Sequence, residues 1–201
     1  MKLKYLFLAL IVPCLISCQK EITGDLETVP PPDNEDAQAY YSAVIGGQSF
    51  SEKVTGNDDT NFFTATSSDA DPELLSAVIN EAVNGTGLII SKGVFPDFEN
   101  ATPATLKAFF SPGLYNYADV DSGIRIAWLD AQGNEWSTVA SSGDQSGSVF
   151  EIKSANDAHD GNGNYYVLIE AVFNCNLYND NNEKKVLTGG KYKGFFGPVE
   201  P

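Results

Sequence analysis

The clearest pattern in this chain is a strict alternation of apolar and polar positions over residues 165–178. Every second residue is apolar or aromatic, and the residues between them include Glu170, Asn174 and Asn176. Because successive side chains of a β-strand point to opposite faces, this period of two predicts a long strand with one buried face. Cys175 falls on that face, where we expect it to act as a small hydrophobic residue.

Shorter runs of the same kind recur from residue 40 onward, and turn-forming residues separate them. Residues 130–134 read as a hairpin loop between strands at 123–129 and 135–140. Further strands are predicted at 41–45, 62–66, 105–110, 114–117, 150–153 and 186–196, the last with a break at Gly189-Gly190. About nine or ten such strands predict one all-β domain over residues 40–201, an antiparallel β-sandwich or a barrel-like sheet.

Residues 72–83 depart from this pattern, because their apolar positions have helical spacing. Asp71 is placed to cap a helix, Pro72 suits a first turn and Gly85 suits a C-terminal end. The periodicity therefore predicts one short helix near 72–83. The apolar positions are Leu74, Leu75, Val78, Ile79, Ala82 and Val83.

The first eighteen residues have the layout of an export signal. Lys2 and Lys4 precede an apolar run at 5–16, which is shorter than the ~20 residues of a membrane-spanning helix. The run ends in Leu-Ile-Ser-Cys at 15–18, which resembles the lipobox of bacterial lipoproteins. The resemblance implies cleavage of a signal peptide, residues 1–17, and attachment of acyl chains at Cys18. It places the protein on the outer membrane, with those chains as its membrane contact.

Residues 18–39 are rich in acidic residues, threonine and proline and offer few apolar groups to bury. Such a composition predicts a disordered or extended tether. Lys20-Glu21 partly resembles the surface-export signal of Bacteroidetes-type lipoproteins, although only one acid follows the lysine directly. Ordinary linker composition explains the pair equally well, so both a surface-exposed and a periplasm-facing domain stay open.

The charge of the chain excludes one class of partner, and its cysteine content bears on disulfide bonding. The chain has 12 basic and 27 acidic side chains, and cleavage before Cys18 would leave 184 residues with a formal charge of −17. This balance argues against nucleic acid, because binding requires Lys and Arg to neutralise phosphates. Cys14 leaves with the signal and Cys18 carries lipid, so Cys175 has no partner and a disulfide scaffold is not expected.

Four features together resemble small Bacteroidetes lipoproteins built around one β-rich domain of unknown function. They are the lipobox with its acidic tether, Ile-Gly-Gly-Gln-Ser-Phe at 45–50, Ser-Pro-Gly-Leu-Tyr at 111–115, and the final strand pair at 171–173 and 190–195. The resemblance implies one β-rich domain over most of 40–196. It also implies that 74–83 is a strand paired with 88–91 across Asn84-Gly85, against the helical periodicity. It supplies no ligand and no catalytic residue.

Catalytic signals are few, so we do not expect an enzyme. His159 is the only histidine, and the chain has neither a Gly-x-Ser-x-Gly elbow nor a phosphate-binding loop. One imidazole and one buried thiol cannot complete the usual zinc site. A glycoside hydrolase needs only two carboxylates and remains the less favoured enzymatic alternative.

The loop after residue 156 offers one candidate metal site. Asp157, Asp160, Asn162 and Asn164 supply side-chain oxygens, and the glycines between them let the backbone curl around Ca²⁺. The spacing is not that of an EF-hand, and the same residue types make ordinary hairpin loops. Calcium is the one cofactor that the sequence suggests, and a plain loop is the alternative. The run 179–182 has a similar composition.

Aromatic residues suggest a sugar-binding surface. Trp128 shares the parity of Ile124 and Ile126 and is expected in the core, whereas Tyr115, Tyr117 and Trp136 lie next to turns and are candidate ligand-binding residues. The sequence thus favours a non-catalytic binding module for carbohydrate or another surface ligand, which predicts two exposed, coplanar aromatic rings. A structural lipoprotein that binds an envelope protein is the alternative, and it predicts an exposed apolar patch or an unpaired edge strand.

Overall fold

The computed structural model describes residues 39–54, 60–67, 73–81, 85–95, 97, 100–118, 123–159 and 163–199. The predicted signal peptide, Cys18 and the tether up to residue 38 lie outside the described residues. Within these ranges, no helix is long and apolar enough to cross a membrane. The elements are β1 (Ala39–Ile45), β2 (Gln48–Val54), β3 (Thr60–Ser67), β4 (Glu73–Glu81), β5 (Gly87–Phe95), α1 (Pro103–Phe109), β6 (Gly113–Tyr115), β7 (Ile124–Leu129), β8 (Glu135–Ser137), β9 (Val149–His159), β10 (Tyr165–Tyr178) and β11 (Lys184–Val199).

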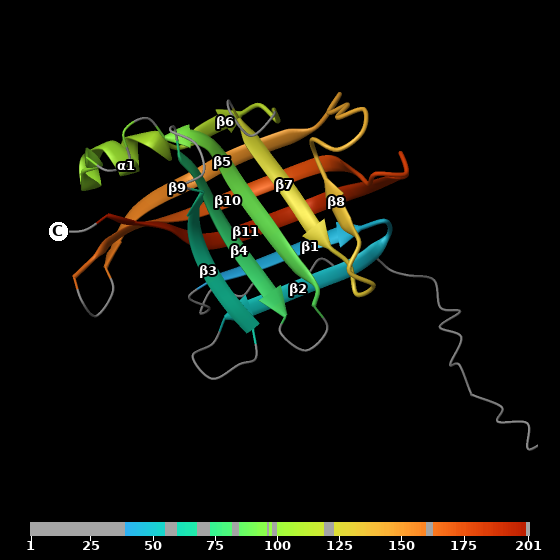
Figure 1. Cartoon of the computed structure of the whole chain (residues 1–201), viewed down its shortest axis with the longest axis horizontal. Helices are drawn as coiled ribbons and strands as arrows, with labels where there is room; N and C mark the ends of the chain where they lie inside the picture. The colour runs from blue at the N-terminus through green and yellow to red at the C-terminus, as the bar shows by residue number, and fades with distance from the viewer. Residues whose placement is uncertain are drawn as a thin grey trace, which may run out of the picture.

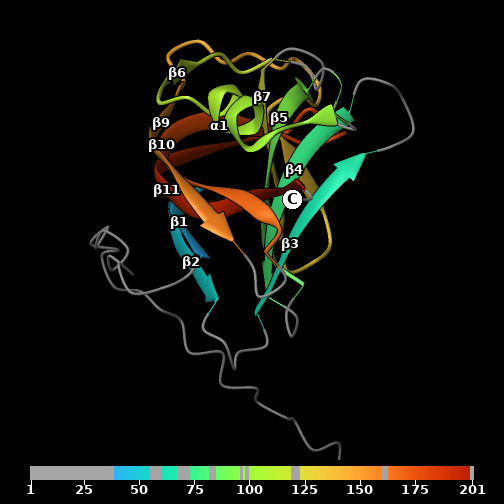
Figure 2. The same ribbon diagram turned by 90° about the vertical axis from the view of Figure 1, so that its left-hand side faces the viewer.

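The strands form one antiparallel sheet that curls without closing into a barrel, which confirms the all-β prediction (Figure 1). The order is β2-β1-β11-β10-β8-β7-β5-β4-β3, and β9 and β6 extend from β10. Figure 2 shows the two halves facing each other, with β9, β10, β11, β1 and β2 on one side and β7, β5, β4 and β3 on the other. The hydrophobic core lies between these halves.

The long strand predicted from the alternation at 165–178 is confirmed as β10. It pairs with β9 on one side and with β11 on the other. Cys175 faces the core as expected and is 2% exposed. Burial raises the pKa of its thiol to about 12, although a hydrogen bond with Tyr117 acts in the opposite direction.

The helix predicted near 72–83 is wrong, because residues Glu73–Glu81 form β4. This strand pairs with β3 along its whole length and with β5 through pairs such as Ala77 with Ile90 and Ile79 with Leu88. Ala77 and Ile79 are both fully buried, which is a period of two. Backbone pairing on both sides and burial outweigh the local helical spacing. The strand that the family resemblance implied is the observed one.

The structure places its helix, α1, where the strand propensity of residues 105–110 had predicted a strand. Thr102 caps the helix through its hydroxyl, which accepts a hydrogen bond from the backbone N–H of Thr105 at 3.2 Å, and a proline stands in the first turn. Leu106 and Phe110, one turn apart, are fully buried. The Phe110 ring lies 4.4 Å from that of Phe196, so α1 covers one end of the core (Figure 1).

The predicted break at Gly189-Gly190 is a bulge inside β11 and not an end of the strand. The register with β10 shifts between the pair Phe173–Gly190 and the pair Cys175–Leu187. A Cβ at Gly190 would lie 2.5 Å from the ring of Phe173, so this position has no room for a side chain. The bulge lets β11 run for 16 residues along β10 and β1. The strand predicted at 135–140 is shorter, since β8 ends at Ser137.

Candidate functional site

The three predicted ligand-binding aromatics do not form an exposed platform. Trp136 is 6% exposed, so its ring does not form a surface on which a ligand could stack. Tyr117 is half-buried, and its hydroxyl donates to the backbone carbonyl of Asn174 at 3.0 Å. The hydroxyl of Tyr115 donates to the carbonyl of Ser111 at 2.5 Å. Among the Trp, Tyr and Phe residues whose side-chain burial is described, which leaves out those of β3, none is exposed.

Trp136 instead belongs to a buried cluster at the β7–β8 hairpin. Its indole N–H donates to Asp130 Oδ2 at 3.0 Å, and Lys185 Nζ lies 3.8 Å from the centre of its ring. Burial would raise the pKa of Asp130, but hydrogen bonds from Trp136, Asn134 and Gln132 lower it to about 2. Trp128 is in the core, as predicted, at 3% exposure. These contacts hold the hairpin together.

The predicted calcium site is only partly within the described residues, which exclude Asp160 and Asn162. Asp157 lies near the end of β9, where it accepts a hydrogen bond from the Tyr165 hydroxyl at 2.6 Å and forms an ion pair with Lys107 at 3.0 Å. Asn164 directly precedes β10. In the part of the chain that is described, no three His, Cys, Asp or Glu side chains lie together as metal ligands. Calcium binding at this loop stays a prediction.

The second asparagine-rich run connects β10 to β11 and has a structural role. The side-chain oxygen of Asn179 accepts hydrogen bonds from the backbone N–H groups of Asn181 at 3.0 Å and of Glu183 at 2.9 Å. Its amide donates to the Glu183 carboxylate at 2.6 Å. These bonds close the hairpin loop through side-chain contacts of the kind that asparagine commonly makes.

Among the described residues, three carboxylates have a shifted pKa, and all three shifts are downward. Besides Asp130, the pKa of Asp144 is lowered by hydrogen bonds from Ser146, and that of Asp157 by hydrogen bonds from Tyr165 and Lys107. The general acid of a glycoside hydrolase needs a raised pKa to hold its proton at neutral pH. Asp130, Asp144 and Asp157 therefore lack the raised pKa that a general acid requires.

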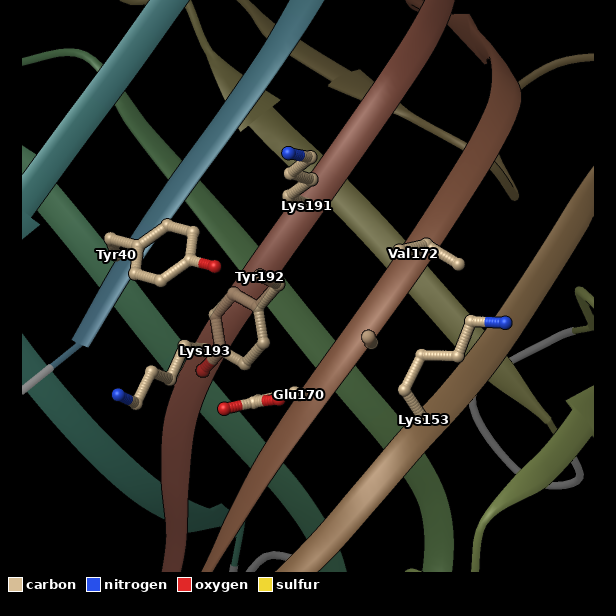
Figure 3. Close-up of a pocket in the computed structure, with 8 residues that line it drawn as sticks. Tyr40, Lys153, Glu170, Val172, Lys191, Tyr192 and Lys193 are labelled. Carbon is tan, nitrogen blue, oxygen red and sulfur yellow. The ribbon is translucent and has the colours of Figure 1, made fainter. Parts of the chain in front are cut away.

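A concave feature lies on the outer face of the sheet, across β9, β10, β11 and β1 (Figure 3). We call it the outer-face basin. It has a volume of about 400 Å³, within the range of small-molecule sites. Its lining residues are Tyr40, Lys153, Glu170, Ala171, Val172, Lys191, Tyr192 and Lys193.

Strand register brings the charged groups of the basin together. Tyr40 of β1 pairs with Lys193 of β11, and Lys193 pairs in turn with Glu170 of β10. Since directly paired residues of neighbouring strands share a face, these three side chains form one row across the sheet. Figure 3 shows Tyr40, Lys193 and Glu170 close together on this face. On the next row, Lys191 pairs with Val172.

A bulge supplies the third lysine of the basin. The register between β9 and β10 shifts after the pair Ser154–Glu170, because Ile152 pairs with Ala171. Lys153 is the extra residue between these two pairs, and bulges of this kind redirect a side chain. Lys153 also forms an ion pair with Glu151 at 2.8 Å.

The basin concentrates positive charge on a strongly acidic chain. Its lining holds three lysines and one glutamate. Lys53 of β2 pairs with Tyr40 and extends the row by one strand. Four of the 12 basic residues of a chain with 27 acids thus lie on this one face. Sequence reasoning missed the site, because these lysines become neighbours only through the register of five strands, β2, β1, β11, β10 and β9.

Comparison of this chain with protein-family models, with curated proteins and with solved structures finds no match.

Proposed function

We propose that this protein is a lipid-anchored, non-catalytic binding protein of the bacterial outer membrane, and that the outer-face basin is its ligand site. The likeness of residues 15–18 to a lipobox supports the anchor at Cys18. Each buried methylene contributes ~0.8 kcal/mol, so two or three acyl chains hold a protein stably where one does not. On this proposal the chain is one of the small Bacteroidetes-type lipoproteins that its motifs resemble.

The observation that carries the binding role is the basin. It combines apolar surface from Tyr40 and Val172 with charged groups from Lys191, Lys193 and Glu170. Sites for small ligands have this character, with apolar walls and a few polar groups that fix orientation. The basin is built on paired strands of a continuous sheet, which holds these side chains in fixed relative positions. A sugar suits it, because a sugar ring has an apolar face for Tyr40 and hydroxyls for the charged groups.

The anchor is tested by feeding cells radiolabelled palmitate and fractionating their membranes. We expect the wild-type protein to carry label and to sediment with the outer membrane, and the Cys18→Ser variant to do neither. Cys175→Ser is the matched control, because it removes the other cysteine that a cleaved chain retains, and we expect it to be labelled normally. Label on the Cys18→Ser variant would refute the assignment.

The ligand site is tested by applying the purified protein to a panel of immobilised neutral and acidic glycans. We expect the wild type to bind a subset and the Tyr40→Ala variant to lose that binding, because the ring forms part of the basin. Lys184→Gln is the control, since Lys184 is an exposed lysine of β11 that does not line the basin. Absence of any glycan binding, or binding that Tyr40→Ala leaves unchanged, would overturn the proposal.

One observation favours the alternative of a protein-binding lipoprotein. Leu114 on β6 is 73% exposed and Val149 on the neighbouring β9 is 43% exposed. Among the described strands, β6 pairs only with β9. Exposed apolar side chains beside a strand edge are a common protein contact. A photo-crosslinking residue in place of Leu114 should give one envelope-protein adduct in living cells, whereas the same residue in place of Val186 should not.

A further inference from the structure

We infer that the ligand of the outer-face basin is an acidic glycan, a sugar chain that carries carboxylate or sulfate groups. This inference rests on the proposed function and narrows its ligand from sugars in general to acidic sugars. It starts from the composition of the lining, in which Lys153, Lys191 and Lys193 outnumber the acid Glu170, while Lys153 also pairs with Glu151 beside the lining.

The charge of the lining favours an anionic ligand. Each lysine ammonium has three N–H donors, and its bonds to ionised oxygens are stronger than bonds between neutral groups. The chain as a whole has a formal charge of −15, so a local excess of lysine is opposite in sign to the rest of the protein. An acidic ligand therefore meets its complement at the basin and is repelled from other surfaces, which restricts where it binds.

The apolar part of the lining favours a sugar over a simple anion. The ring of Tyr40 and the side chain of Val172 lie among the charged groups (Figure 3). A phosphate or sulfate ion would use only the lysines. An acidic sugar uses both kinds of surface, because its ring has apolar C–H faces and its substituent carries the charge.

The same charges disfavour two other polyanions. DNA and anionic bilayers extend far beyond the basin and would meet the acidic surface of the protein. The lining also contains no arginine, the residue best suited to bidentate phosphate contacts. Arg125 lies on β7 and is engaged by Glu135, with Nη2 2.5 Å from Oε1.

The row of paired residues suggests how the glycan lies. Lys53, Tyr40, Lys193 and Glu170 occupy four adjacent strands, β2, β1, β11 and β10. Neighbouring strands are ~4.8 Å apart, so the backbones at the two lysines of this row are roughly 10 Å apart with the tyrosine between them. An oligosaccharide laid across the strands would place a ring on Tyr40 and acidic groups at Lys53 and Lys193. Glu170 would accept a hydrogen bond from a sugar hydroxyl.

The test is calorimetric titration of the full mature protein with an oligosaccharide of galacturonic acid. Its methyl ester is the matched ligand, because it keeps the sugar and removes the charge. A sulfated oligosaccharide tests the second acid type. We expect both acidic ligands to bind, the ester to bind about tenfold more weakly or worse, and the affinity for the acids to fall as salt rises.

Substitutions of lysines inside and outside the basin test whether the acidic ligands bind there. Lys191→Gln/Lys193→Gln should weaken binding of the acids by about tenfold or more, and Lys184→Gln should leave it unchanged. Each variant is first shown to unfold at the wild-type denaturant concentration, which separates loss of the site from loss of the fold.

The outcomes distinguish this inference from the proposed function. Equal binding of acid and ester, abolished by Tyr40→Ala, would overturn the inference and leave a sugar-binding basin in place. Absence of binding to every acidic and neutral sugar would overturn both. Binding of duplex DNA or of phosphatidylglycerol vesicles that depends on Lys191 and Lys193 would overturn the inference in favour of another polyanion.

Discussion

Trp136 donates its indole N–H to the carboxylate of Asp130 at 3.0 Å, across the turn that joins β7 to β8. The same carboxylate accepts hydrogen bonds from the backbone N–H groups of Gln132 at 3.0 Å and of Asn134 at 2.9 Å. Lys185 Nζ lies 3.7 Å from Asp130 Oδ2 and above the indole ring. One buried acid therefore organises the turn and fixes the tryptophan.

Replacing this acid should destabilise the hairpin. Asp130→Asn keeps the shape of the side chain but removes its charge, so the hydrogen bonds from Trp136 and the turn weaken. We expect a loss of ~1.5–3 kcal/mol in the free energy of unfolding at neutral pH, measured by urea denaturation. Glu135→Gln is the control, because the Arg125–Glu135 ion pair is largely exposed and should contribute no more than ~1 kcal/mol.

The contribution of Asp130 should depend on pH. Its pKa is lowered from 3.8 to about 2 in the folded protein, so the folded state favours the charged form. The stabilisation is therefore complete above about pH 4 and is lost as the pH falls towards 2. The wild type and Asp130→Asn should converge in stability over this acid range. A constant difference between them across the range would contradict the assignment.

The hydroxyl groups of Tyr192 and Tyr165 should contribute differently to the free energy of unfolding. Tyr192 is 1% exposed, and its hydroxyl has no hydrogen-bond partner among the described residues, whereas the Tyr165 hydroxyl donates to Asp157 at 2.6 Å. Burial of an unpaired hydroxyl costs ~1–3 kcal/mol. Tyr192→Phe should therefore leave the free energy of unfolding unchanged or raise it, and Tyr165→Phe should lower it. The reverse order in denaturant titrations would contradict the packing described for Tyr192.

Cys175 should be unreactive in the folded protein. It is 2% exposed, and its pKa is raised to about 12, so almost no thiolate is present at mildly alkaline pH. Site-resolved mass spectrometry after iodoacetamide treatment should find Cys175 unmodified until denaturant unfolds the domain. Rapid labelling of the native protein would show that β10 does not bury this face.

The alternation at 165–178 specified its strand correctly, because β10 is buried on one face and receives pairing on both edges. Two assignments elsewhere were wrong, the helix near 72–83 and the strand at 105–110. β4 is a strand because β3 and β5 pair with it, against its local spacing. α1 is a helix because Thr102 and Pro103 start it, a signal that was present in the sequence and was outweighed by the strand propensity of residues 105–110.

The candidate site was much harder to predict than the fold class. Lys53, Lys153 and Lys191 are far apart in the sequence, and each alone resembles an ordinary solvent-exposed lysine. Four strand pairings, β2–β1, β1–β11, β11–β10 and β10–β9, and one bulge bring them to one face. The opposite error occurred at Trp136, which lies beside a turn and was named as a candidate ligand-binding residue. The buried carboxylate of Asp130 accepts a hydrogen bond from the indole N–H of Trp136, so the ring can be buried.

The central claim, that an acidic glycan binds in the outer-face basin, is tested most directly by lysine footprinting. The mature protein is acetylated with and without the galacturonic acid oligosaccharide, and the modification of each lysine is read by mass spectrometry. The account predicts protection of Lys153, Lys191 and Lys193, with Lys107 and Lys184 modified to the same extent in both samples. Protection confined to lysines outside the basin, or no protection at any lysine, would contradict it.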